Sequence, residues 1–290
     1  MTNFFRCFFL MGLCPLFSEV RTIESFTEIE HELLAQDCHT LIVFDVDEVL
    51  ITAKDQALKT PHKDVFRKIA REYFEKAQTP AEKKMIEYRL SLTYLYPSRI
   101  LVEKLVVPMI RQLQQKGIYV MGITRCRSGR YGIIPEVEHW RKEVLLKRGI
   151  DFDNGAFDSV RCVLSQEDSN GRKTPKFEDG LLFGRGYPKD YLVAKLIHDL
   201  NLEIYKVYMI DDERSKLLNL DYLQNYEVHP IEYTGAKKFL RKISLRQVNW
   251  QVSKLLQTGR WYEDEDIEEL GIFGGFFRYH VPSFWQMLFG

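Results

Sequence analysis

The chain of 290 residues carries no excess charge of either sign, because 41 basic side chains balance 41 acidic ones. Such a chain lacks the broad positive field by which proteins bind nucleic acid or anionic lipid, so we predict no nucleic-acid partner. Repeats, heptads and low-complexity tracts are absent, which argues against repeat arrays and coiled coils. There is also no Walker-type loop, no His-Glu-x-x-His and no Cys-x-x-Cys, so the usual signatures of nucleotide, zinc-protease and dithiol redox sites are missing.

Cysteine is scarce, and two of the five residues, Cys7 and Cys14, lie in an apolar stretch near the N-terminus. Residues 1–18 begin with one basic side chain, continue as an apolar run to Phe17 and end at the small residue Ser18. The run is too short for a transmembrane helix and has the outline of a secretory signal, so we expect cleavage after Ser18 and export to the periplasm or the medium. If the stretch is retained as a buried strand or helix instead, the protein is cytoplasmic. The other three cysteines cannot all pair within one chain.

The most informative segment is Leu41–Leu50, with the sequence LIVFDVDEVL. Its apolar, β-prone start predicts a buried parallel strand that ends in Asp45 and Asp47. Side chains two apart on a strand point the same way, so both carboxylates would meet at the carboxyl end, where open α/β sheets bind their ligands. Two carboxylates so close call for a shared proton or a cation, and Mg²⁺ suits oxygen ligands. The alternative is that the aspartates merely cap the next element.

Two later segments have the same form of an apolar run that ends in polar side chains. Residues 117–125 predict a strand that ends at Thr124 and Arg125, whose hydroxyl and guanidinium groups suit phosphate oxygens. A threonine that closes a strand because β-branched residues fit there is the alternative. Residues 204–213 predict another strand, and this one ends in the acidic pair Asp211 and Asp212.

A lysine stands at the start of a predicted helix between these two strands. Gly186 and Pro188 form a turn, and Lys189 occupies the first helical turn, where the helix dipole disfavours a cation. A cluster of carboxylates and phosphate near that turn would account for the placement. On sequence grounds Lys176 or Lys195 would serve equally well.

In this order the four segments resemble the motifs of the haloacid dehalogenase superfamily of phosphohydrolases and phosphotransferases, over roughly residues 25–265. Within it, the chain is most similar to a group of uncharacterised bacterial proteins that carry a domain of unknown function. The resemblance implies an α/β fold, with a Rossmann-like parallel sheet flanked by helices and a small helical cap inserted after the first motif strand. The expected divisions are the signal peptide 1–18, a core of 19–51 and 97–270, the cap 52–96 and an aromatic tail 271–290.

The resemblance also implies a Mg²⁺-dependent phosphatase that acts on a small phosphorylated substrate. Asp45 would attack the phosphorus and form an aspartyl-phosphate, and Asp47 would act as general acid and then base. The implied ligands of Mg²⁺ are Asp45, Asp47 through its main-chain carbonyl, Asp211 and Asp212, and the implied phosphate-binding residues are Thr124, Arg125 and Lys189.

Two other functions remain open at this stage. A phosphotransferase would use the same residues and differ only in the acceptor of the phosphoryl group. A non-catalytic exported protein would keep the fold for binding or for an effector role, since fold alone does not establish function. The complete set of motif residues favours the enzyme. The tail 271–290 is rich in aromatic residues, and it either packs back on the domain or contacts a partner or a membrane.

The segments between the motifs are mostly helical in pattern. A capping box at Thr79-Pro80-Ala81-Glu82 marks the start of one helix. Asn170-Gly171 is a hairpin turn signal. The expected helices are 25–36, 62–77, 80–95, 98–116 with an interruption at Pro108, 135–148 and 236–257, and the further expected strands are 159–164, 180–183 and 228–233.

Overall fold

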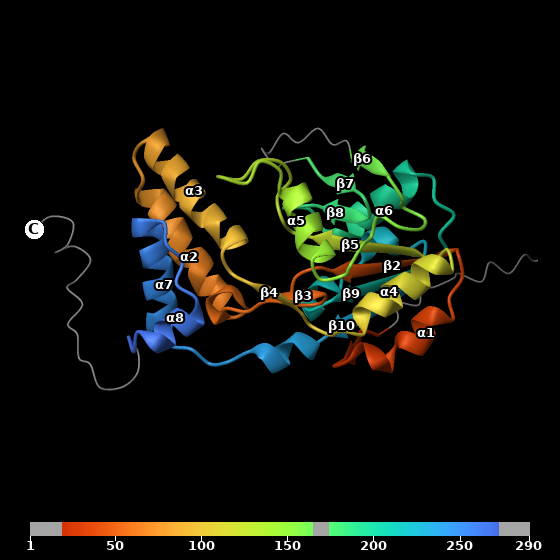
Figure 1. Cartoon of the computed structure of the whole chain (residues 1–290). Coiled ribbons are helices and arrows are strands. Elements are labelled where there is room, and N and C mark those ends of the chain that lie inside the picture. Colours follow the sequence, from red (N-terminus) through yellow and green to blue (C-terminus); the bar gives the residue numbers. More distant parts are fainter. Residues whose placement is uncertain (1–18, 165–173, 273–290) are drawn as a thin grey trace, which may run out of the picture. The chain divides into compact units, whose positions relative to one another are not determined.

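The structure is a computed structural model of the chain, and it describes residues 19–164 and 174–272 (Figure 1). These residues divide into two compact units. The expected signal peptide, the expected turn at Asn170-Gly171 and residues 273–290 of the expected tail lie outside the described residues. Within the described ranges, no helix is long and apolar enough to cross a membrane.

The first unit contains the described residues up to Thr52, together with Leu101–Arg130 and Glu136–Lys238. Its strands are β1 (Arg21–Ile23), β2 (Thr40–Asp45), β5 (Tyr119–Thr124), β6 (Arg161–Val163), β7 (Lys176–Glu178), β8 (Leu181–Phe183), β9 (Lys206–Asp211) and β10 (Glu227–Tyr233). Its α-helices are α1 (Glu30–Leu34), α4 (Val106–Gln115), α5 (Val137–Leu146) and α6 (Lys189–Asp199).

The strands of the first unit form one sheet in the order β1-β10-β9-β2-β5-β8-β7-β6. Neighbours from β1 to β8 are parallel, and β7 and β6 extend the sheet as antiparallel strands. Helices flank this sheet (Figure 1). The prediction of an α/β fold with a mostly parallel central sheet is therefore confirmed.

The central strand β2 has β9 on one side and β5 on the other. The chain runs from β2 to β5 on one side, and it returns through β8 and α6 to β9 on the other. The strand order thus reverses at β2. In open α/β sheets this reversal leaves a crevice at the carboxyl ends of the strands, which is where such folds bind ligands.

Strand periodicity decides which face of the sheet each side chain joins. Leu41 and Val43 of β2 are buried in one core cluster with Leu192 and Leu196 of α6. Val207 and Met209 of β9 belong to the same cluster. Because side chains two apart share a face, the next residues in each series, Asp45 and Asp211, point to the α6 face.

The other face of the sheet has its own apolar cover. The rings of Phe26 and Phe44 meet edge to face with centroids 5.8 Å apart, and Phe26 stacks on Tyr233. Helix α4 packs against β5 and α1 with Met109 and Leu113 fully buried. Both faces of the parallel strands are therefore covered, which is why Leu41–Phe44 of β2 are all apolar.

The second unit contains Ala53–Ile100, Tyr131–Pro135 and the described residues from Phe239 onward. Its α-helices are α2 (His62–Lys76), α3 (Pro80–Leu95), α7 (Leu245–Thr258) and α8 (Asp264–Glu269). The strands β3 (Ile51–Ala53) and β4 (Arg99–Leu101) pair with each other and contain two of the points where the chain passes between the units.

The division differs from the expected one at its C-terminal end. Residues 239–270, which the sequence predicts in the core, group with 53–100 in the second unit. The reason is the apolar face of α7, on which Val248, Val252 and Leu255 are fully buried in one cluster with residues of α2 and α3. A face at i, i+4 and i+7 must be covered, and the sequence does not say by which partner.

Two predicted helices were partly wrong. Residues 98–105 are not helical, because the chain forms β4 and then begins α4 at Val106. Pro108 is the third residue of that helix and does not interrupt it, since the first N–H groups of a helix have no intrahelical partner. The helix expected at 236–257 is divided into a 3-10 turn at Gly235–Phe239 and α7, which begins after the N-cap Ser244.

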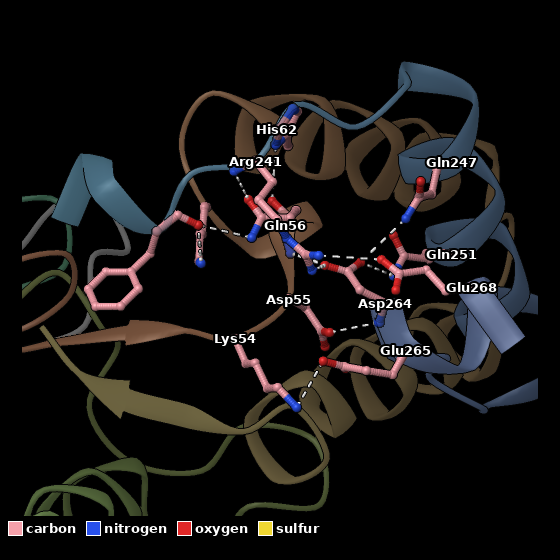
Figure 2. A network of polar contacts seen from close by, with 12 residues as sticks. Lys54, Asp55, Gln56, His62, Arg241, Gln247, Gln251, Asp264, Glu265 and Glu268 are labelled. Carbon is pink, nitrogen blue, oxygen red and sulfur yellow. Dashed lines mark hydrogen bonds and ion pairs between the residues drawn. The ribbon is translucent and has the colours of Figure 1, made fainter. Parts of the chain in front are cut away.

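A polar network joins the start of the second unit to its C-terminal helix (Figure 2). Asp55 accepts hydrogen bonds from the main-chain N–H of Asp264 at 3.0 Å and from the indole N–H of Trp261 at 2.6 Å. In return, the carboxylate of Asp264 accepts from the N–H of Gln56 at 2.8 Å. Two chain segments some 200 residues apart are thereby held together by buried, hydrogen-bonded carboxylates.

Candidate functional site

Three of the predicted site residues meet at the carboxyl ends of β2 and β9. Lys189 lies with its Nζ 2.8 Å from Asp45 Oδ1 and 2.6 Å from Asp211 Oδ2. Lys189 is the first residue of α6, which packs on the face to which both aspartates point, so the helix delivers its N-terminus to the strand ends. Asp212 lies beside them, and its carboxylate, with those of Asp45 and Asp211, offers oxygens within 4.8 Å of one another.

Of the three lysines that the sequence leaves open, Lys189 is the one that contacts the acidic residues. Lys176 pairs with Glu138 and Glu178, at 3.4 and 2.8 Å, and Lys195 pairs with Asp199 at 2.8 Å. Neither of these two lysines has an ion pair with the acidic cluster of Asp45, Asp211 and Asp212 in the described part of the chain.

Burial and charge set the electrostatics of this cluster. Burial raises the pKa of Asp45 against the opposing effect of Lys189, and Asp211 adds to the rise. Burial acts the same way on Asp211, but Lys189 and Lys216 hold its pKa below the ordinary value. Burial would lower the pKa of Lys189, yet Asp45 and Asp211 raise it, so the ammonium ion is strongly stabilised.

Asp212 is the member of the cluster with the least compensation. Burial, followed by the charges of Asp45 and Asp211, raises the pKa of Asp212 to about 8. Its carboxylate has no hydrogen bond or ion pair with any residue that the structure describes. A carboxylate with so little compensation beside two others is an arrangement that a cation would stabilise.

The donor set fits a hard divalent cation. Asp45, Asp211 and Asp212 supply carboxylate oxygens only, which are the ligands that Mg²⁺ prefers. Soft or borderline ions such as zinc more often take histidine or cysteine, and neither residue type belongs to this group.

Thr124 and Arg125 follow the neighbouring strand and differ in their surroundings. Asp45 lies opposite Ile123 in the parallel register, so Thr124 ends β5 at the same edge of the sheet as Asp45. Thr124 is buried, and its hydroxyl accepts a hydrogen bond from the N–H of Cys126 at 3.2 Å. Arg125 is exposed, and no contact brings it to the acidic cluster in the described structure.

Asp47 does not join the acidic cluster but forms a bidentate pair with Arg141. The two guanidinium N–H groups of Arg141 donate to Asp47 Oδ1 at 3.0 Å and Oδ2 at 3.1 Å. The Arg141 side chain is only 2% exposed, and it also contacts Cys126 Sγ at 2.9 Å. Burial would lower the pKa of Arg141, but Asp47 and Cys126 raise it. Cys126 is a free thiol that contacts this pair.

Sequence reasoning missed Arg141, although α5 carried a signal for it. Val137 and Leu145 of α5 are buried, and Arg141 lies four residues from each, in the middle of this apolar stripe. A charged residue in a buried stripe implies a buried partner. Glu138 of the same helix is also buried and accepts two hydrogen bonds from the N–H of Gly129, so α5 holds the loop that follows β5 as well.

Sequence reasoning also missed Lys216, which lies in a 3-10 turn (Arg214–Lys216) after β9. Its Nζ is 3.6 Å from Asp211 Oδ1 and 2.8 Å from Glu213 Oε1. No sequence signal singled it out, because an isolated lysine after a strand is usually a surface residue.

The fold and the site together define an α/β protein with a cluster of carboxylates and lysine at the point where the order of its parallel strands reverses. Residues 22–268 match the model of the family DUF2608, described as proteins of unknown function, and the chain belongs to this family. No curated protein and no solved structure matches the chain significantly.

Proposed function

We propose that the protein is a Mg²⁺-dependent phosphohydrolase of the haloacid dehalogenase type that acts on a small phosphate monoester. The observation that carries the proposal is the meeting of Asp45, Lys189 and Asp211 from three separate chain segments at one strand edge. A carboxylate nucleophile, an ammonium group and a set of oxygen ligands for a cation are the parts that phosphoryl transfer requires.

Asp45 is the nucleophile in this proposal. One of its carboxylate oxygens forms a bond to phosphorus while the bond from phosphorus to the leaving oxygen breaks, which yields an aspartyl-phosphate and an alcohol. Lys189 pairs with Asp45 and offsets the negative charge that gathers on the phosphoryl oxygens. Asp45, Asp211 and Asp212, with the main-chain carbonyl of Asp47, would hold Mg²⁺, which when bound neutralises charge on the phosphoryl group.

Asp47 moves protons in both halves of the reaction. It gives a proton to the leaving oxygen, and it then takes one from the water that attacks the aspartyl-phosphate and releases phosphate from Asp45. The bidentate pair with Arg141 orients the Asp47 carboxylate. A guanidinium also favours a carboxylate over the neutral acid, so the pair with Arg141 suits the second step, in which Asp47 accepts a proton from water, and opposes the first, in which Asp47 must be protonated.

Thr124 and Arg125 would bind phosphate oxygens at the end of β5, as the resemblance implies. Residues 52–96, the cap that the resemblance implies, would select the substrate. The phosphotransferase reading differs only in the acceptor, which is an alcohol in place of water.

Hydrolysis of para-nitrophenyl phosphate by the full chain tests the proposal. We expect nitrophenolate release with Mg²⁺, none with EDTA, and a loss of at least about 10³-fold in kcat for Asp45→Asn, because the nucleophile is removed. Asp199→Asn is the matched control, since Asp199 lies at the far end of α6 and pairs with Lys195. This variant should keep the wild-type rate.

Two results would contradict the proposed enzymatic function. Release that persists at the same rate in Asp45→Asn excludes Asp45 as nucleophile. A folded wild-type chain that neither releases nitrophenolate nor binds Mg²⁺ by calorimetry favours the non-catalytic binding protein instead.

A further inference from the structure

The carboxylates of the site carry more negative charge than Lys189 neutralises. When ionised, Asp45, Asp211 and Asp212 carry three negative charges, and Lys189 supplies one positive charge. A divalent cation would bring this sum to zero. A phosphate monoester, however, brings about two further negative charges near neutral pH. A site of zero net charge has no electrostatic attraction for such an anion, so one more cation would supply what is missing.

Lys216 lies beside Asp211 and supplies a further positive charge at the cluster. Lys189 contacts one oxygen of Asp211, Oδ2, at 2.6 Å, whereas Lys216 lies 3.6 Å from the other oxygen, Oδ1. The Asp211 carboxylate therefore has an ammonium group on each side.

Lys216 is also held more loosely than Lys189. Its side chain is 17% exposed, compared with 6% for Lys189. Its shorter contact is an ion pair with Glu213, whose side chain is 48% exposed. Exposed ion pairs contribute little, typically below about 1 kcal/mol, so the ammonium group can exchange this partner for a stronger one at small cost.

We propose that Lys216 is a second phosphate-binding residue, which exchanges Glu213 for a non-bridging oxygen of the phosphoryl group of a phosphate monoester dianion. The inference rests on the proposed function for the location of the phosphoryl group. Glu213 is then a resting partner that occupies Lys216 while no phosphate is bound. Two simpler roles compete with this one, namely a structural ion pair with Glu213 and a cation that competes with Mg²⁺ for Asp211.

The test is direct binding of inorganic phosphate to the full chain in saturating Mg²⁺ by calorimetry. We expect Lys216→Met to raise the Kd for phosphate by about 10- to 100-fold, because a charge-assisted hydrogen bond is lost. Lys216→Arg keeps the charge and should stay within a few fold of wild type. Glu213→Gln should leave the Kd unchanged or lower it, because the competing carboxylate is gone. Lys195→Met removes a lysine of α6 away from the cluster and should have no effect.

Each alternative gives a different result. If Lys216→Met and Glu213→Gln weaken phosphate binding equally, the ion pair is structural and the inference is overturned. If Lys216→Met tightens Mg²⁺ binding but leaves the Kd for phosphate unchanged, Lys216 only competes with the metal, and the inference is overturned too.

The hydrolysis assay separates this inference from the proposed function. Wild-type hydrolysis with a phosphate Kd that does not depend on Lys216 overturns the inference alone. Phosphate binding that depends on Lys216, without hydrolysis by the wild type, supports the inference and overturns the enzyme. If the wild type neither hydrolyses the ester nor binds phosphate, both the inference and the proposed function are overturned.

Discussion

Asp45 and Asp47 are two residues apart but have opposite electrostatic surroundings. Asp45 is crowded by the carboxylates of Asp211 and Asp212, with Lys189 as compensation. Asp47 faces the guanidinium of Arg141, which is buried and makes two hydrogen bonds to it. The same substitution at the two positions should therefore change stability in different ways.

We predict that Asp47→Asn lowers the free energy of unfolding by about 3–5 kcal/mol, because it leaves the buried guanidinium of Arg141 without a countercharge. Asp45→Asn should change it by less than about 1 kcal/mol, because it removes one of three repelling carboxylates while Lys189 keeps Asp211. Urea unfolding near neutral pH without divalent cations measures both values.

The double variant Asp47→Asn with Arg141→Met is the control for this comparison. It removes both charges, so part of the lost stability should return. Equal destabilisation by the two single variants would show that the Arg141 pair contributes nothing specific. The result also bears on kinetics, since activity lost in Asp47 variants must be separated from lost folding.

At the scale of an element, the turn after β2 contains an unusual backbone conformation. Glu48 has a φ of 66°, in the left-handed region that side chains other than glycine rarely adopt. Three main-chain hydrogen bonds hold the turn. The N–H of Glu48 donates to the carbonyl of Ile51, and the N–H groups of Leu50 and Ile51 both donate to the carbonyl of Val46. The turn directs the chain immediately after Asp47, so local strain accompanies the site.

We predict that Glu48→Gly is more stable than Glu48→Ala by about 1 kcal/mol, because glycine adopts a positive φ without steric cost. Both variants lose the hydrogen bond that Thr52 donates to the Glu48 carboxylate at 2.9 Å, so the comparison isolates the backbone term. The difference is read from urea unfolding followed by circular dichroism. An alanine variant as stable as the glycine variant would mean that the turn relaxes at no cost.

At the scale of the whole molecule, the second unit depends on chain segments that are far apart in the sequence. Asp55, near its start, accepts a hydrogen bond from the N–H of Asp264, near its end (Figure 2). It also accepts one from the indole N–H of Trp261. Burial raises the pKa of Asp55 to about 6 from an ordinary value of 3.8, in spite of these hydrogen bonds. The ionised form is thus less favourable in the folded unit than in the unfolded chain.

We predict that the stability of the second unit falls as the pH rises through about 6, the pKa of the buried Asp55 carboxyl. In the folded state Asp55 binds its proton more tightly than in the unfolded chain, so this contribution is complete below the unfolded pKa and is lost above the folded one. A shift from 3.8 to about 6 corresponds to roughly 3 kcal/mol. Urea unfolding at pH 4 to 7 measures it, followed by the fluorescence of a variant that keeps Trp261 and has phenylalanine at the other three tryptophans.

Asp55→Asn is the control for the pH dependence. It should be less stable at every pH. An asparagine side chain has one acceptor oxygen in place of two, so its NH₂ group must face the N–H of either Trp261 or Asp264. Its stability should nevertheless change less between pH 4 and 7 than that of the wild type. A wild-type midpoint that rises across this range would contradict the assigned effect of burial.

The predictable parts of the fold are those that depend on residues close together in the sequence. Strands β2, β5 and β9 are apolar runs that end in polar residues, α3 begins at a capping box, and α6 begins after the Gly186 and Pro188 turn. The Thr79 capping box has both of its expected hydrogen bonds, to and from Glu82. These features depend on residues within a few positions of one another, so sequence pattern is enough to locate them.

The chain's local pattern thus placed Asp45, Lys189, Asp211 and Asp212 at strand and helix ends, because side-chain periodicity and helix starts are short-range properties. The selection of Lys189 over Lys176 and Lys195, the pairing of Asp47 with Arg141 and the position of Lys216 came from the fold. Each of these depends on contacts between residues far apart in the chain, and such contacts follow from which buried face packs on which, a choice that no local window of sequence contains.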